Sequence, residues 1–157
     1  MATEEQKKER QTRLFNDIIA GFAKGLYDLF GDSALAMVAT LGDKILGEME
    51  QELGLEISGE SAQDILTEIS RLLVDEYGIS DEIDTIITDD DIAITVTNCR
   101  LWRTSASLEK NDVPPYICVP MMMASASLRE RLGMKSKFTG IEQDKDKHIC
   151  KIAFKMF

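Results

Sequence analysis

The sequence lacks several features that would mark a secreted protein or a membrane protein. No apolar run approaches the ~20 residues needed to cross a bilayer, and residues 1–13 are polar without a signal-peptide core. The three cysteines are odd in number and widely spaced, which does not suit a disulfide framework. We therefore expect a cytoplasmic protein whose thiols are free or metal-bound.

Motifs of common catalytic sites are also missing. The sequence has no phosphate-binding loop, no dinucleotide-binding glycine pattern, no nucleophile elbow and no His-Glu-x-x-His motif. His148 is the single histidine, so a pair with Cys118 could form, but no third group is placed to orient it. An enzyme that uses a Cys118 thiolate is the least favoured hypothesis. The sequence favours a binding or assembly module that is not an enzyme.

Acidic residues predominate, and they are distributed unevenly. The net charge is −10. Residues 43–91 hold sixteen acids and two bases (−14), whereas residues 92–157 hold eleven bases and six acids (+5). An acidic chain is not expected to bind nucleic acid. The two parts either complement each other within the fold or form a charge-guided docking surface for other subunits of an assembly.

Apolar side chains recur at helical spacing through the first half of the chain. After a loose polar start, a helix is expected from Leu14 to Gly31, a second ends at Gly54, and a third runs from Ser61 to Gly78. The first two helices have wide apolar stripes that we expect to form a homodimer interface. Its predicted residues are Phe15, Ile18, Phe22, Leu26, Met37, Leu41 and Ile45.

The apolar period then changes from 3.6 to 2, which indicates strands. Four segments are expected to form two hairpins: 83–87 with 92–97, and 136–142 with 148–156. Residues 101–117 are expected to be a loop, and a helix with Pro120 in its first turn should end at Gly133. The order predicts an α+β fold, with N-terminal helices packed on a roughly four-stranded antiparallel sheet and one inserted helix.

The thiols and the imidazole are candidate metal ligands. Three thiols with His148 or Glu142 would be enough for a tetrahedral zinc site, although no C-x-x-C spacing supports one. The candidates are Cys99, Cys118, Glu142, His148 and Cys150. Cys118 precedes a predicted helix, where the helix dipole lowers a thiol pKa. His148 and Cys150 should share the core face of the last strand. The simpler interpretation is that the cysteines are small buried hydrophobes.

Large, adaptable apolar side chains gather around the predicted inserted helix and the loop before it. They either complete the core or line an apolar pocket that would suit a lipid-like or aromatic ligand. The predicted pocket residues are Trp102, Tyr116, Met121, Met122, Met123 and Phe138.

The second half of the sequence resembles a known family. A strand that ends in Asn98-Cys99, a loop, Pro115-x-x-Cys118 at the start of a helix, and a final hairpin with Cys150 are similar to the 4-vinyl reductase-type, or hydrocarbon-binding, domain. Small subunits of TRAPP vesicle-tethering complexes share that fold. The resemblance covers residues 14–157, and its specific part is residues 91–154.

This resemblance implies an α/β sandwich that dimerises through N-terminal helices and acts as a ligand sensor or scaffold. Some members hold zinc on cysteines that match Cys118 and Cys150, but Glu142 stands where another hairpin cysteine would be. No histidine precedes Trp102, so phenol-type sensing is not implied. No cysteine precedes Asn98, so the acylation of TRAPP subunits is excluded.

Together these observations predict a flexible start at residues 1–13 and one domain at residues 14–157. The domain should be a non-enzymatic homodimer that senses a small apolar ligand or scaffolds an assembly. A zinc-binding regulatory domain is the alternative.

Overall fold

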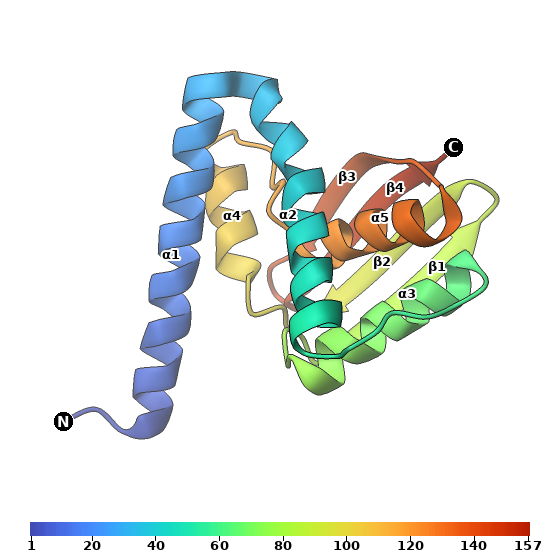
Figure 1. Cartoon of the computed structure of the whole chain (residues 1–157). Helices are drawn as coiled ribbons and strands as arrows, with labels where there is room; N and C mark the ends of the chain where they lie inside the picture. The colour runs from blue at the N-terminus through green and yellow to red at the C-terminus, as the bar shows by residue number, and fades with distance from the viewer.

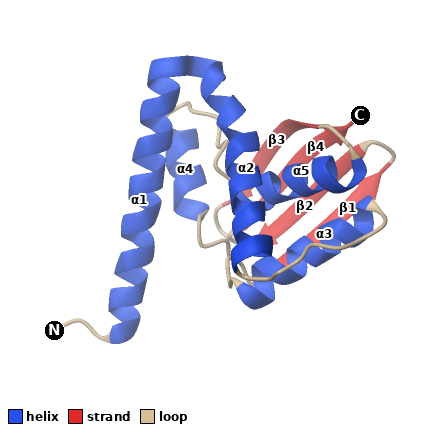
Figure 2. Ribbon diagram, viewed as in Figure 1, coloured by secondary structure: helices blue, strands red, loops and turns tan.

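A computed structural model describes residues 1–157 (Figure 1). Helices come first and the sheet follows, which confirms the predicted α+β class (Figure 2). The elements are α1 (Glu4–Phe30), the 3-10 turn η1 (Gly31–Ala36), α2 (Met37–Gly47), the π-helical turn η2 (Glu48–Glu52), α3 (Ala62–Arg71), the π-helical turn η3 (Leu72–Glu76), β1 (Glu82–Thr88), β2 (Asp91–Thr97), α4 (Trp102–Lys110), α5 (Val119–Leu132), β3 (Ser136–Asp144) and β4 (Ile149–Met156). None of the helices is both long enough and apolar enough to pass through a bilayer.

The sheet is built from the two predicted hairpins. Its strand order is β1-β2-β4-β3, and every neighbouring pair is antiparallel. The central strands alternate buried and exposed residues, so that Ile94 and Ile152 face each other on the covered side. Helices α3 and α5 lie over this side in Figure 1. The opposite side of the sheet is open, as is common for antiparallel sheets.

The apolar interior has two parts. The main cluster of 21 buried residues lies between the sheet and α2, α3 and α5. A second cluster of five buried residues joins α1 and η1 to α4 and the segment after it; its members are Ala23, Ala34, Leu108, Val113 and Tyr116. The Tyr116 hydroxyl donates a hydrogen bond of 2.7 Å to the carbonyl oxygen of Ala23. Helix α1 is therefore held mainly by the second cluster.

Helix α1 begins ten residues earlier than the sequence pattern predicted. Thr3 and Gln6 form a capping box, in which each side chain accepts a hydrogen bond from the other residue's backbone N–H. The following residues are strong helix formers, and Arg13 pairs with Glu9 at 2.9 Å. The expected loose polar start is wrong for residues 4–13, because apolar periodicity alone does not report a capped polar turn.

Helix α4 lies where a loop was predicted, so the sheet carries two inserted helices instead of one. Leu101, at its N-cap position, offers no capping side chain. The cap comes from Asn16 on α1, whose Oδ1 accepts hydrogen bonds from the N–H of Thr104 at 3.0 Å and from its hydroxyl at 2.9 Å. The start of α4 thus depends on a residue 88 positions away, which no local pattern reveals.

The two oppositely charged parts of the chain meet in the fold. Arg129 of α5 pairs with Asp43 of α2, and Arg131 pairs with Glu50 of η2. These two ion pairs agree with the interpretation that the two parts complement each other within the fold.

Candidate functional site

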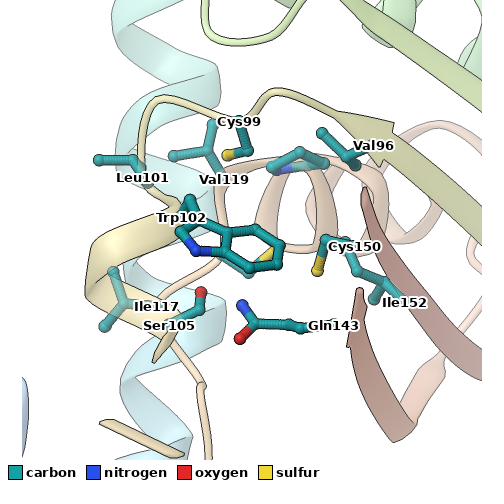
Figure 3. Close-up of a pocket in the computed structure, with 12 residues that line it drawn as sticks. Val96, Cys99, Leu101, Trp102, Ser105, Ile117, Val119, Gln143, Cys150 and Ile152 are labelled. Atoms are coloured by element: carbon teal, nitrogen blue, oxygen red, sulfur yellow. The ribbon is translucent and has the colours of Figure 1, made fainter. Parts of the chain in front are cut away.

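The three cysteines meet around the side chain of Trp102. Cys99, Cys118 and Cys150 line one small cavity with Trp102, and Figure 3 shows the indole ring near Cys99 and Cys150. The volume of this cavity is about 10 Å³, which is room for about one water molecule. These residues are far apart in the sequence, and the fold brings them together.

The predicted pocket residues do not share this cavity. Of the six, only Trp102 lines it. Met121 and Met123 are buried in the main cluster, and Phe138 packs against that cluster. Met122 is also buried, and its carbonyl oxygen lies against Gly42 of α2. Tyr116 belongs to the second cluster. The cavity at Trp102 has no room for a hydrocarbon.

Two of the predicted metal ligands, Glu142 and His148, do not line the cavity with the three cysteines. Across β3 and β4, Cys150 pairs with Gln143, whereas Glu142 pairs with Lys151 on the open side of the sheet. His148 precedes β4 in a turn with φ of 52° and is exposed, so the prediction that it shares the core face with Cys150 is wrong. No three His, Cys, Asp or Glu side chains of the chain are grouped to hold a metal ion.

The thiols are held in their protonated form. Burial raises the pKa of Cys118 far above its usual range, and the nearby Cys99 and Cys150 raise it further. Burial likewise raises the pKa of Cys150 to about 12 and raises that of Cys99. The expected lowering at Cys118 by the α5 dipole is therefore wrong, because loss of hydration outweighs it. Metal binding and nucleophilic attack both require the thiolate.

Outside the cavity, Trp102 stacks against the exposed His148. Their ring centroids are 5.5 Å apart, with the planes tilted by 36°. This pair lies in an open groove between α1, α4 and the β3–β4 turn, which we call the basic groove because Arg13, Arg103, Lys110 and Lys145 line it. No sequence motif pointed to it, since its residues come from three distant segments.

The side of α1 that faces away from α4 is apolar and exposed. We call this surface the outer face of α1; its residues are Leu14, Phe15, Ile18, Phe22, Leu29 and Phe30, each between 56% and 76% exposed. The opposite side of the helix buries Asn16, Ala20 and Ala23. Figure 1 shows α1 at the edge of the molecule, with the other elements on one side of it. Helix α1 therefore has two apolar sides and uses one of them within the fold.

The predicted dimer residues divide between surfaces. Phe15, Ile18 and Phe22 lie on the outer face of α1, whereas Leu26 is half-buried against the second cluster. The three residues predicted on α2 are half-buried: Met37, Leu41 and Ile45. Leu14, Leu29 and Phe30 also lie on the outer face of α1 but are not among the predicted residues, because a single apolar stripe was expected on this helix. A helical wheel separates its two apolar sides.

Comparison with known proteins identifies the family of the chain. The model of a family described as "Putative rubredoxin C-terminal domain" matches residues 15–157. The chain therefore belongs to this family, and the proposed resemblance to 4-vinyl reductase-type domains and TRAPP subunits is wrong. The short Pro-x-x-Cys pattern behind that resemblance marks a helix start, which many folds contain. A search of curated proteins found no match.

Two solved H-NOX structures are similar to this chain at low identity. One is a Cs H-NOX mutant that carries 4-cyano-L-phenylalanine, with 10% identity, a TM-score of 0.46, and coverage of 83% of this chain and 66% of that chain. The other is a mutant of T. Tengcongensis H-NOX, with 9% identity, a TM-score of 0.44, and coverage of 90% and 96%. The chain spans just under two thirds of the first protein. At these scores the likeness supports no functional inference.

Proposed function

We propose that this member of the rubredoxin C-terminal domain family is a non-enzymatic binding module that acts as a homodimer, joined through the outer face of α1. One observation carries the proposal: six large apolar side chains on one side of a helix are more than half exposed. Monomeric proteins rarely expose a contiguous apolar patch of this kind, and such patches mark interaction sites.

The size of the outer face matches what a dimer needs. If each of these large side chains presents about 150–250 Å² when fully exposed, as aromatic side chains do, six that are about 60% exposed present roughly 540–900 Å². A standard interface buries about 800 Å² per partner. The outer face alone is thus sufficient, and the half-buried apolar residues of α2 need not contribute.

The outer face of α1 extends from Leu14 to Phe30, so an antiparallel pair of copies would be centred near Phe22. A two-fold axis of this kind gives both copies the same contacts, as in most homodimers.

The thiols support a role other than catalysis. Burial keeps their pKa values high, and the exposed His148 stacks on Trp102. The family name also refers to a rubredoxin. Iron held by protein sulfur takes four cysteine thiolates, and three buried, protonated thiols do not fit such a site.

Sedimentation velocity across a series of concentrations tests the proposal. We expect the wild type to dimerise at micromolar concentration, and Phe22→Asp to raise the dissociation constant at least about a hundredfold, because it places a charge at the centre of the interface. The matched control is Ile86→Asp, since Ile86 is 63% exposed on β1. Equal effects of the two substitutions, or none, would contradict the proposal.

A further inference from the structure

The basic groove is electropositive on an acidic protein. Its lining includes four bases and one acid, Glu109; when Glu9 and Asp17, which pair with Arg13 and Arg103, are counted as well, the balance is +1 (four minus three), whereas the whole chain carries −10. The bases come from three elements: Arg13 from α1, Arg103 and Lys110 from α4, and Lys145 from the β3–β4 turn. Cations gathered from separate elements around one hollow create a local positive potential that attracts anions.

The nearby acids leave these cations available. Arg13 pairs with Glu9 at 2.9 Å, and Arg103 pairs with Asp17 at 3.5 Å. All four side chains are more than half exposed, so each pair contributes little and can exchange partners at small cost. Lys110 and Lys145 form no ion pair with an N···O distance of 4.0 Å or less.

Two aromatic rings lie in the wall of the groove, which is wide and open to solvent, with a volume of about 920 Å³. Trp102 and His148, with ring centroids 5.5 Å apart, form part of its wall. Aromatic side chains of this kind stack well on planar heterocycles.

A buried amide without a partner adds a polar contact point. Gln143 lines both the small cavity and the basic groove, and Figure 3 shows its amide beside Trp102 and Ser105. Both its Nε2 and Oε1 are buried and make no hydrogen bond. Cys150, its partner across the strands, offers only a weak thiol. Because both atoms are shielded from solvent, a ligand in the groove reaches this amide only when the side chain turns outward, and it then supplies the hydrogen bonds that the amide lacks.

We propose that the basic groove binds a nucleotide: a planar heterocycle that carries phosphate. The ring stacks on the Trp102–His148 pair, its polar edge meets the Gln143 amide, and the phosphate takes the Arg103 guanidinium, whose fork matches phosphate oxygens. Lys110 and Lys145 add charge at the two sides of the groove. The site does not depend on the homodimer, because it lies beside α4 and its residues come from one chain.

Fluorescence titration tests this site directly, because Trp102 is the only tryptophan. The probes are ADP and FMN, with adenosine and pyrophosphate as the separate halves of ADP. We expect ADP or FMN to change the emission saturably, with a dissociation constant below about 1 mM. Each half of ADP alone should bind at least about tenfold more weakly, because it makes only one of the two contacts.

Two sets of variants connect the binding to the groove. The double variant Arg103→Gln and Lys145→Gln should weaken nucleotide binding at least about tenfold. The control with the same loss of charge is Lys137→Gln and Lys155→Gln. It removes two lysines that face each other across β3 and β4, and it should leave binding unchanged. Gln143→Leu should weaken binding and raise the melting temperature, a combination that a purely structural residue would not produce.

No saturable change with either ADP or FMN would overturn the proposal. An equal loss of binding in the two double variants would overturn it as well, since this would indicate a nonspecific charge effect.

Discussion

Asn16 and Thr104 join α1 to α4 through a buried pair of hydrogen bonds. The Asn16 Oδ1 accepts from the Thr104 N–H at 3.0 Å and from its hydroxyl at 2.9 Å, while the Asn16 Nδ2 donates to the carbonyl oxygen of Arg100 at 2.9 Å. Arg13 lies one turn before Asn16, and Arg103 directly precedes Thr104. This one amide therefore sets the position of both the basic groove and the outer face of α1.

Replacing the Asn16 amide should destabilise the protein strongly. Asn16→Leu keeps the volume but leaves the buried Thr104 N–H and hydroxyl unpaired, so we expect a loss of about 2–4 kcal/mol in the free energy of unfolding. Urea denaturation measures it. Asn111→Leu is the control, since Asn111 is exposed and bonds only within its own helix end. A loss under about 0.5 kcal/mol for Asn16→Leu would rule out this role.

Two glycines of α2 should respond in opposite directions to alanine. A Cβ at Gly42 would lie 2.7 Å from the carbonyl oxygen of Met122, whereas a Cβ at Gly47 would meet nothing within 4 Å. Gly42→Ala should thus separate α2 from α5 and cost about 1–3 kcal/mol. Gly47→Ala should stabilise the helix by about 0.5–1 kcal/mol. Thermal unfolding of both variants checks this, and a shift of the same sign in each would be inconsistent with the packing.

Burial of the thiols should make the stability of the protein depend on pH in the alkaline range. Because burial raises the pKa of Cys150 from 9.0 to about 12, the folded state holds this proton more tightly than the unfolded state. Its contribution to stability is complete below about pH 9 and is lost as the pH rises from there towards 12. Cys150→Ala should flatten the pH dependence of the melting temperature in that window. A profile identical to that of the wild type would disprove the link.

Labelling provides an independent measurement on the same thiols. Iodoacetamide at neutral pH should modify Cys118 at least about tenfold more slowly in the folded protein than in urea, because only the thiolate reacts. Rapid labelling of folded Cys118 would instead support the hypothesis of a thiol-dependent enzyme.

The sequence was sufficient for features that rest on local patterns. The capping residues Ser61 and Asp64, the helix end at Gly133 and the two hairpins are as predicted. The position of Glu142 was not predictable, since a register shift between Phe138 and Gly140 precedes it. The same holds for α4, whose cap is 88 residues away. The groove residues are separated just as widely.

The mass of the wild-type protein in solution is the direct test of the proposed homodimer. One chain has a mass of 17.6 kDa, so the homodimer has 35.2 kDa (twice 17.6). Sedimentation equilibrium at about 50 µM, above the dissociation constant expected for an interface of this size, should give the dimer mass. A mass of 17.6 kDa at that concentration would show a monomer and would contradict the proposed homodimer.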